Sequence, residues 1–409
     1  MKIQGDQIVK HIVLVIGNYK NGGVAMRSTN LANAFAQKGY HVIILVRKFI
    51  GQEVYFEHHD NVKVVQLSEY IKKHSQELHS FNKKLQKRTW LYKKLRYITR
   101  FFPKLDGLLA NEIRQIRKGD QVAAYAWLNR DSVFIPFGFP CYEATVYAAK
   151  KFHCPIIYAE KNAPEIEFPS DIVDKATIAK ELAKANGVVC QTQAGRDFFG
   201  DLLKNAVVIN NPVKADLPER YEGERRKVIV NFCRISKQKN LPLLFEAAVE
   251  FHKDYPEFTF EIYGNTVETY EEELRDEYIK LIDSLGASSY IKLLPPSKKV
   301  HTLIRDCAMF VSTSDFEGLS NSMIEAMAIG LPCICTDCLG GGAREVIQDG
   351  VNGLLVPMKD ARALYLAMKK MVQDPEFAEM CSKQATTINQ DLALETISNK
   401  WLEFITNVI

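Results

Sequence analysis

Short apolar runs alternate with longer amphipathic segments along the chain, and near residue 227 the whole alternation starts again. Apolar runs of strand length separated by helix-length segments are typical of parallel sheets covered by helices on both faces. The segment 211–223 divides the two series, because it holds two prolines and has no clear period. The sequence therefore predicts an α/β protein with two Rossmann-like, doubly wound parallel-sheet domains, 1–212 and 213–388, that face a cleft. A last amphipathic helix is expected within 389–409. This helix could pack back on the N-terminal domain.

The individual elements are assigned from the same runs. The strands expected in the N-terminal domain are 11–17, 40–46, 62–67, 122–125, 133–136, 155–160, 188–191 and 207–209, with a helix over 24–38. The strands expected in the C-terminal domain are 227–233, 258–263, 291–294, 309–313 and 333–336, with helices over 241–253, 271–284 and 392–407.

Composition restricts the class of protein. The chain is 47% hydrophobic and 25% charged, as is usual for a globular protein, and no apolar run approaches the ~20 residues of a membrane helix. The first apolar run, 12–16, is too short for a signal-peptide core, so a cytoplasmic location is expected. Nine cysteines are scattered through apolar runs, as expected for reduced, buried thiols. No second Cys/His pair stands at zinc spacing from Cys333–Cys338 and no Asp-x-Asp occurs, so no metal cofactor is expected.

Charge is shared unevenly between the two halves. Residues 1–212 hold 31 Lys and Arg against 19 Asp and Glu, a balance of +12, whereas residues 213–409 hold 22 against 30, a balance of −8. This asymmetry indicates that the N-terminal half meets an anionic surface or substrate.

Two glutamates, Glu317 and Glu325, lie eight positions apart between an expected strand and Gly330. Polar residues at the carboxyl end of a strand are typical of ligand sites in open α/β sheets, and the N-terminus of the following helix suits a phosphate. The alternative is a capping box in which Glu325 only reaches back to the backbone of Ser322. These residues alone leave both interpretations open.

Two cations, Arg234 and Lys239, follow the first strand of the C-terminal domain. An Arg fork with a Lys point charge can bind a diphosphate and stabilise a phosphate leaving group, and the alternative is a solvated basic loop. A dinucleotide oxidoreductase is disfavoured, because the second strand ends in Arg47-Lys48 where the ribose-binding acidic residue would stand.

Together with Gly340-Gly341-Gly342 and the segment 349–357, these residues resemble the donor domain of retaining glycosyltransferases of family 4, which have the two-domain GT-B fold. The resemblance covers essentially the whole chain and is strongest over 227–357. In the N-terminal domain, four motifs are similar to family members that build bacterial surface polysaccharides: Gly22-Gly23, 160–164, Gln191-Thr192 and Asn211-Pro212.

The resemblance implies transfer of a sugar, with retention, from a nucleotide-sugar to a cell-envelope glycan, an anionic polymer or a lipid-linked acceptor. UDP is the expected nucleotide. The implied catalytic residues are Arg234 and Lys239 at the diphosphate and Glu317 beside the transferred sugar. The implied donor-binding residues are Glu325 at the ribose, the backbone of Gly318, Leu319 and Ser320, the facing Gly22 and Gly23, and Tyr263, Gly264 and Leu294 as walls for the base.

The chain departs from the family pattern at two places. Cys233 stands where the family usually has glycine, and the region 135–140 lacks the histidine that many members carry. Glu160 and Asn162 are the expected acceptor-side residues, with a buried or capping carboxylate as the alternative for Glu160. Two other functions stay open: a GT-B UDP-sugar epimerase or hydrolase that needs no acceptor, and a degenerate glycan-binding accessory subunit, against which the retained charged residues argue.

A basic aromatic segment, 81–104, lies in the N-terminal half. Between Lys83 and Lys104 it holds nine Lys and Arg, no acidic residue, and interleaved aromatic side chains. Such a helix can contact an anionic membrane, or it can pack its apolar side on its own domain, and both interpretations are kept. Nucleic acid is not an expected partner, because no nucleic-acid motif accompanies the charge.

Overall fold

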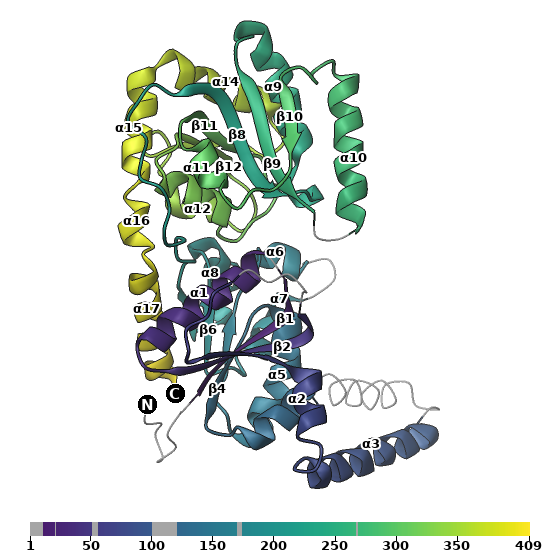
Figure 1. The fold of residues 1–409 in the computed structure, drawn as a ribbon. Coiled ribbons are helices and arrows are strands. Elements are labelled where there is room, and N and C mark those ends of the chain that lie inside the picture. The colour runs from purple at the N-terminus through teal and green to yellow at the C-terminus, as the bar shows by residue number, and fades with distance from the viewer. Residues whose placement is uncertain (1–10, 21, 51–55, 100–120, 170–173, 267–268) are drawn as a thin grey trace.

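The computed structural model describes residues 11–20, 22–50, 56–99, 121–169, 174–266 and 269–409. Two α/β domains are stacked end to end, and the C-terminal helices run along one side of both (Figure 1). The prediction of two parallel-sheet domains is confirmed.

The N-terminal domain is built on parallel strands in two hydrogen-bonded groups. The strands are β1 (His11–Tyr19), β2 (His41–Ile50), β3 (Val62–Gln66), β4 (Ser132–Pro136), β5 (Ile157–Ala159), β6 (Gly187–Cys190) and β7 (Ala206–Val208). Their orders are β3-β2-β1-β4 and β5-β6-β7, and parallel bridges from Phe134 to Ile156 and from Phe137 to Ala159 connect the two groups. The central run Ile12–Ile16 is fully buried, because helices cover both faces of the sheet.

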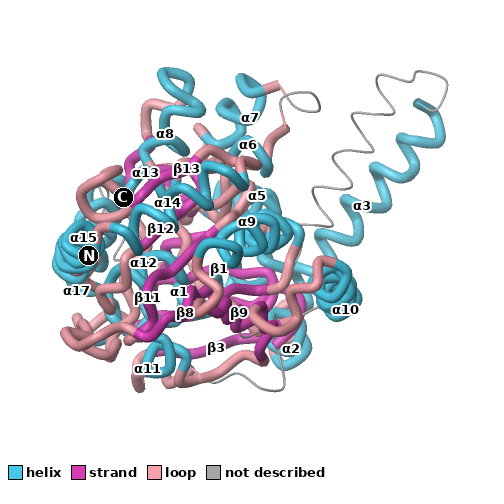
Figure 2. Tube along the Cα trace, turned by 90° about the horizontal axis from the view of Figure 1, so that it is seen from above, coloured by secondary structure: helices cyan, strands magenta, loops and turns pink. Residues whose placement is uncertain are grey.

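The helices of this domain connect successive strands. They are α1 (Gly23–Gln37), α2 (Leu67–Lys73), α3 (His79–Thr99), α5 (Phe139–Phe152), α6 (Pro164–Glu167), α7 (Lys175–Leu182), α8 (Gln193–Phe199) and the 3-10 turn η1 (Gly200–Leu202). Helix α3 projects away from the rest of the molecule in both views (Figures 1 and 2).

The C-terminal domain has one six-stranded parallel sheet in the order β10-β9-β8-β11-β12-β13. The strands are β8 (Arg226–Arg234), β9 (Thr259–Asn265), β10 (Ile291–Leu294), β11 (Cys307–Ser312), β12 (Cys333–Thr336) and β13 (Leu354–Val356). The helices are η2 (Lys237–Lys239), α9 (Leu241–Asp254), α10 (Thr269–Ser284), α11 (Val300–Ile304), α12 (Asn321–Ala328), α13 (Gly342–Val346), α14 (Ala361–Gln373), α15 (Pro375–Ala385) and α16 (Ile388–Asp391).

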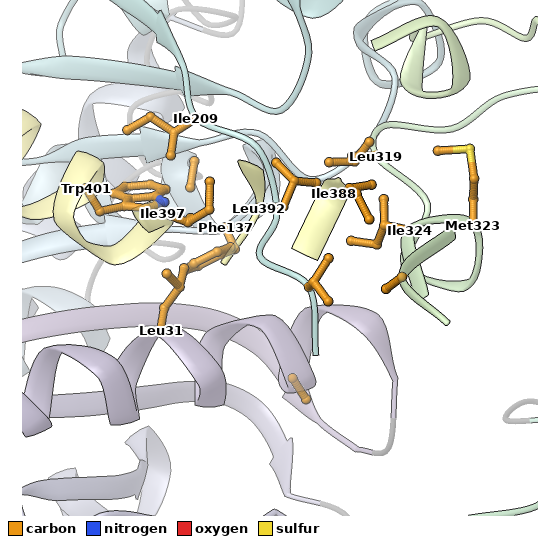
Figure 3. Close-up of a cluster of buried hydrophobic side chains, with 14 of the residues drawn as sticks. Leu31, Phe137, Ile209, Leu319, Met323, Ile324, Ile388, Leu392, Ile397 and Trp401 are labelled. Carbon is orange, nitrogen blue, oxygen red and sulfur yellow. The ribbon is translucent and has the colours of Figure 1, made fainter. Parts of the chain in front are cut away.

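The last helix, α17 (Leu394–Val408), packs on the N-terminal domain. Its Trp401 is 1% exposed and lies with Leu31 of α1 in one continuous apolar cluster (Figure 3). The same cluster includes Ile324 of α12, so it extends through both domains. The chain therefore crosses between the domains twice, at the linker and before α17, and the apolar contacts of α17 hold the domains together.

One predicted element is wrong. Residues 122–125 were expected to form a strand, but 121–128 are helical. Val122 to Ala126 are buried against the core of the N-terminal domain. A short apolar run is ambiguous between a buried strand and a buried helix, and the three alanines in this run favour the helix.

Candidate active site

The candidate site lies where β8 and β11 end. These strands are neighbours in the sheet, so the loop after Arg234 and the loop after Ser312 meet at one edge. Four hydrogen bonds join the two loops: Asp315 N to Gln238 O, 2.9 Å; Gln238 Nε2 to Phe316 O, 2.8 Å; Asn240 Nδ2 to Asp315 Oδ1, 2.9 Å; and Thr313 Oγ1 to Lys239 O, 2.9 Å. The loops therefore form one connected unit.

An ion pair between Lys239 and Glu317 lies at the centre of this unit. Ser314 Oγ also donates to Glu317 Oε1, at 3.1 Å. The two charged side chains are only 14% and 15% exposed. Burial by itself would lower the pKa of Lys239, but the attraction and the hydrogen bond of Glu317, together with the nearby Cys233, outweigh it and the pKa is raised. Lys239 is therefore a cation at neutral pH, held beside a carboxylate in a partly dehydrated site.

Arg234 stands at the end of β8 and is 45% exposed. Its Nη1 lies 3.4 Å from Oε1 of Glu271, a fully buried residue of α10. This contact anchors the guanidinium while much of it stays accessible to a ligand. The two cations predicted to hold a diphosphate stand five residues apart in the chain, Arg234 at the end of β8 and Lys239 in the turn η2 that follows it.

Glu325 lies in α12 and is bound to His301 of α11, with 2.7 Å between Oε2 and Nε2. Helix α12 begins after Ser320, two residues earlier than a capping box on Ser322 requires, and the N-cap carries no side-chain hydrogen bond. The capping alternative for Glu325 is therefore wrong. His301 was missed by the sequence reasoning, since nothing in the spacing of α11 and α12 shows that they meet.

Two glycines, Gly340 and Gly342, support the loop that carries Glu317. A Cβ on Gly340 would lie 2.0 Å from the carbonyl oxygen of Glu317, and one on Gly342 would lie 1.7 Å from that of Gly318. Gly340 also has φ +84, a conformation that side chains disfavour. Glycine at 340 and 342 therefore lets two backbone segments touch, and this contact fixes the position of the Glu317 loop.

The N-terminal domain meets this loop through Gln191. Its Oε1 accepts from Leu319 N at 3.2 Å and from Asn211 Nδ2 at 3.0 Å, and a Cβ on Gly318 would lie 2.9 Å from it. Leu319 and Ser320 are only 4% and 7% exposed. The predicted ligand contacts of Gly318, Leu319 and Ser320 stay predictions, and the Leu319 N–H reaches a ligand only if Gln191 moves.

The start of α1 faces the start of α12. A Cβ on Gly23 would lie 3.3 Å from Nδ2 of Asn321, whereas Gly22 has open space around its Cα. Two helix N-termini thus approach each other from opposite domains, and each favours negative charge. The arrangement suits the predicted role of Gly22 and Gly23 at a diphosphate.

The residues predicted as base walls divide between the two faces of the sheet. Tyr263 pairs in register with Phe232 on one side and Leu294 on the other, so these three side chains share a face. Phe232 also packs edge-on against His301, which places this row beside Glu325. Gly264 lies on the opposite face, where a Cβ would be 2.3 Å from Ile235.

A pocket of about 440 Å³ opens on the Gly264 side. It is lined by Gly264, Thr266, Glu272, Arg275, Asp276, Pro295 and Pro296. Tyr263 and Leu294 are not part of its lining, so the predicted base walls do not form a single pocket.

On the acceptor side, Glu160 is 3% exposed. Its Oε2 accepts from Gln191 N at 2.8 Å, and its backbone oxygen accepts from Arg27 Nη1 at 3.0 Å. The geometry fits the alternative of a buried carboxylate better than an acceptor-facing group. Asn162 is half-buried and accepts from the N–H of Ala163 at 3.0 Å.

Burial raises the pKa of Glu160 to about 8, although the Gln191 hydrogen bond acts in the opposite direction. An unfolded Glu titrates near ~4.3, so between these values the native state binds more protons, and the free energy of unfolding falls as pH rises. We expect E160Q to lack this loss, which amounts to at most about 1.4 kcal/mol per pH unit between about pH 5 and pH 8. Thermal melts of both proteins across this range measure it, and parallel pH curves would contradict the assignment.

Within the described ranges, no group of three or more His, Cys, Asp and Glu is arranged to hold a metal ion. Among the helices described, none combines the length and the apolar character that crossing a membrane requires. All nine cysteines are free thiols, and eight of them are buried.

Two parallel-sheet domains that face each other across glycine-rich helix N-termini and a charged loop define the GT-B class of fold. Residues 214–387 match the model of the family described as glycosyl transferases group 1. The resemblance to GT-B glycosyltransferases of the bacterial surface-polysaccharide type is confirmed, and membership of family 4 stays a prediction.

Several curated relatives match part of the chain, among them two bacterial transferases. The poly(ribitol-phosphate) alpha-N-acetylglucosaminyltransferase of Staphylococcus aureus is 29% identical over 229 residues, 55% of this chain and 45% of the relative. An N-acetylgalactosamine-N,N'-diacetylbacillosaminyl-diphospho-undecaprenol 4-alpha-N-acetylgalactosaminyltransferase of Campylobacter jejuni is 29% identical over 187 residues, 46% of this chain and 48% of the relative. The chain thus spans about half the length of these relatives.

Several solved structures match nearly the whole chain, and two of them illustrate the likeness. TarM superposes with a TM-score of 0.72 at 16% identity, covering 97% of this chain and 98% of its own. Anabaena HepE in complex with UDP superposes with a TM-score of 0.69 at 16% identity, covering 97% of this chain and 100% of its own. At this level of identity the likeness establishes the fold.

Proposed function

We propose that this protein is a retaining glycosyltransferase of family 4 that moves a sugar from a nucleotide-sugar to a cell-envelope acceptor. The observation that carries the proposal is the buried Lys239–Glu317 pair, which lies at the strand ends with Arg234, in the loop that leads into α12, whose start faces the glycine start of α1. A structural ion pair alone needs neither an exposed second cation nor a facing helix N-terminus.

In the proposed reaction the bond between the anomeric carbon and the diphosphate oxygen breaks, and its electron pair stays on the diphosphate. The acceptor hydroxyl forms the new bond to the anomeric carbon, and its proton passes to the leaving diphosphate oxygen. Arg234 and Lys239 stabilise the negative charge that grows on the leaving diphosphate. Glu317 lies beside the sugar and orients Lys239, and Glu325 binds the ribose.

We propose UDP as the nucleotide. The structure of Anabaena HepE, which shares the fold, holds UDP, and another of the same protein holds UDP-glucose. A thermal-shift screen of UDP-, GDP-, ADP- and dTDP-sugars tests this choice, because a ligand that binds only the native state raises its melting midpoint. A shift with UDP-sugars alone supports the proposal, and no shift with any nucleotide-sugar would overturn it.

We propose a growing cell-envelope glycan, an anionic polymer or a lipid-linked precursor as the acceptor. The names of the two curated relatives refer to poly(ribitol-phosphate) and to a diphospho-undecaprenol-linked sugar, both of which carry phosphate. The +12 balance of residues 1–212 suits an acceptor of this charge. Asn162 stays the proposed acceptor-side residue, and Glu160 is proposed on that side as a buried carboxylate rather than as a group that touches the acceptor. Catalysis is proposed at the cytoplasmic face of the membrane.

Helix α3 is the proposed membrane contact, within the predicted segment 81–104. Of that segment, 100–104 lies outside the described residues. Trp90, Leu91 and Leu95 are 55%, 49% and 37% exposed, so these three do not pack on their own domain. Lys94 Nζ lies 4.1 Å from the centre of the Trp90 ring. Exposed apolar rings between cations are typical of a helix that lies on an anionic membrane surface.

Replacing the exposed Lys93 and Lys94 together with Ala is expected to weaken binding to vesicles that contain anionic lipid about 30-fold, since each cation near such a surface contributes about 1 kcal/mol. Co-sedimentation with anionic and with neutral vesicles measures it. The control replaces Lys383 and Lys400, which are exposed on α15 and α17. Equal binding to both kinds of vesicle, or no binding to either, would remove the membrane contact.

The alternative of an epimerase or hydrolase uses the same donor site. Product analysis without any acceptor distinguishes it, because a transferase leaves the UDP-sugar unchanged or hydrolyses it slowly. Rapid conversion of the free donor would favour the alternative. An accessory subunit would bind the donor with no turnover under any condition.

A further inference from the structure

We propose that His301 is a positioning residue for the nucleotide: it fixes the carboxylate of Glu325 so that the site discriminates ribose from 2′-deoxyribose. This inference rests on the proposed function, because it concerns how the same site recognises its donor.

The pair joins the two helices that flank β11 in the chain. His301 lies in α11, within the connection from β10 at one edge of the sheet to β11, and Glu325 lies in α12, which follows β11. The strands β9 and β8 lie between β10 and β11, so this connection crosses them. The ring of His301 packs against Phe232 of β8, two residues before Arg234, which places the pair near the end of that strand, where the proposed nucleotide lies.

His301 is itself held in place. Its ring is 5.5 Å from the ring of Phe232 with an interplanar angle of 84°, an edge-on contact. Both members of the pair are less than a tenth exposed, at 8% for His301 and 6% for Glu325. A short hydrogen bond in such a site restricts the carboxylate to one orientation.

The Glu325 carboxylate can accept hydrogen bonds from a diol while it is bound to His301. An ionised carboxylate can only accept, so the Nε2 of His301 carries the hydrogen and donates to Oε2. Each carboxylate oxygen has two acceptor positions, so Oε1 and the second position on Oε2 can accept from two neighbouring hydroxyls. A ribose presents such a pair at its 2′ and 3′ positions, whereas a 2′-deoxyribose presents one hydroxyl.

The expected consequence is selectivity that depends on His301. A buried site built to bind a hydroxyl rejects an analogue that lacks it, and hydrogen bonds to charged groups are the strong ones. With His301 present, we expect UDP to bind about 10- to 100-fold more tightly than 2′-deoxy-UDP. Without it, Glu325 has no fixed orientation, and the two affinities should come within about threefold of each other.

The experiment is calorimetric titration of UDP and 2′-deoxy-UDP into the whole protein, its H301A and H301Q variants, and an H79A control in which an exposed histidine of α3 is changed. H301A should lose affinity for UDP much more than for 2′-deoxy-UDP. H301Q should restore the ratio, because the Gln amide can donate from near the position of Nε2. In turnover, H301A should raise the donor KM and leave kcat almost unchanged.

The outcomes distinguish a failure of the proposed function from a failure of the role proposed for His301. If the unchanged protein binds neither nucleotide, the proposed function fails and this inference with it. If the unchanged protein discriminates and H301A discriminates equally, only the inference fails. If H301A does not fold, as shown by its melting curve, H301Q and H301N decide: the long amide should keep the ratio and the short one should lose it, and equal ratios would overturn the inference.

Discussion

Replacing Lys239 with Ala is expected to lower kcat/KM for the donor by about 10²- to 10³-fold, the loss typical for a group that stabilises charge in a transition state. The change removes a cation from the proposed diphosphate site. It also leaves the Glu317 carboxylate, 15% exposed, with Ser314 as its remaining hydrogen-bond donor in the described residues. Steady-state kinetics of UDP release with a saturating acceptor measures the effect.

The matched control is Lys237→Ala. Lys237 belongs to the same 3-10 turn, but it is exposed and lies two residues away from the ion pair. The control is expected to keep kcat/KM within about twofold, since an exposed cation contributes little. Similar losses in both variants would mean that the loop needs general positive charge, and an unchanged K239A would remove Lys239 from the site.

Replacing Glu325 with Ala is expected to raise the donor KM by about 10- to 100-fold and to lower kcat much less. Glu325 would bind the ribose, which does not change during the reaction, so its loss removes binding that substrate and transition state share. The variant also leaves His301 without its hydrogen-bond acceptor, which costs about 1–3 kcal/mol of stability. Kinetics at varied donor concentration, together with a melting curve, measures both effects.

An exposed glutamate of α9, Glu246, supplies the control for this change. Glu246→Ala should leave KM and the melting midpoint unchanged. A large fall in kcat for E325A at saturating donor would contradict the division of roles in which Glu317 serves the chemistry and Glu325 serves the nucleotide.

The sequence predicted the polar core of the site because topology brings it together. Arg234, Lys239 and Glu317 follow neighbouring parallel strands, and parallel strands end at one edge of the sheet. Alternation alone implied parallel strands, so both loops were expected at the same edge of the sheet, and the structure shows that β8 and β11 are neighbours. The prediction of a strand at 122–125 was wrong because a short apolar run has no period that distinguishes a strand from a helix.

Contacts between elements that are not neighbours could not be predicted. His301 of α11 bonds to Glu325 of α12 on the far side of β11 in the chain, and no spacing along the sequence shows that these two helices meet. The capping alternative for Glu325 was wrong because α12 begins after Ser320 and not after Ser322. A sequence pattern places the ends of a helix only to within one or two residues, so it could not show this. Glu160 was placed on the acceptor side by resemblance, whereas its burial against Arg27 depends on packing.

The central claim is that a nucleoside diphosphate binds between the Arg234 and Lys239 cations and the Glu325 carboxylate. A crystal structure of the protein with UDP tests it most directly. The account predicts the diphosphate within hydrogen-bond distance of Arg234 and Lys239, with the ribose hydroxyls on Glu325 and the start of α1 facing the phosphates. UDP bound instead in the pocket beside α10, with the Lys239–Glu317 pair untouched, would contradict it.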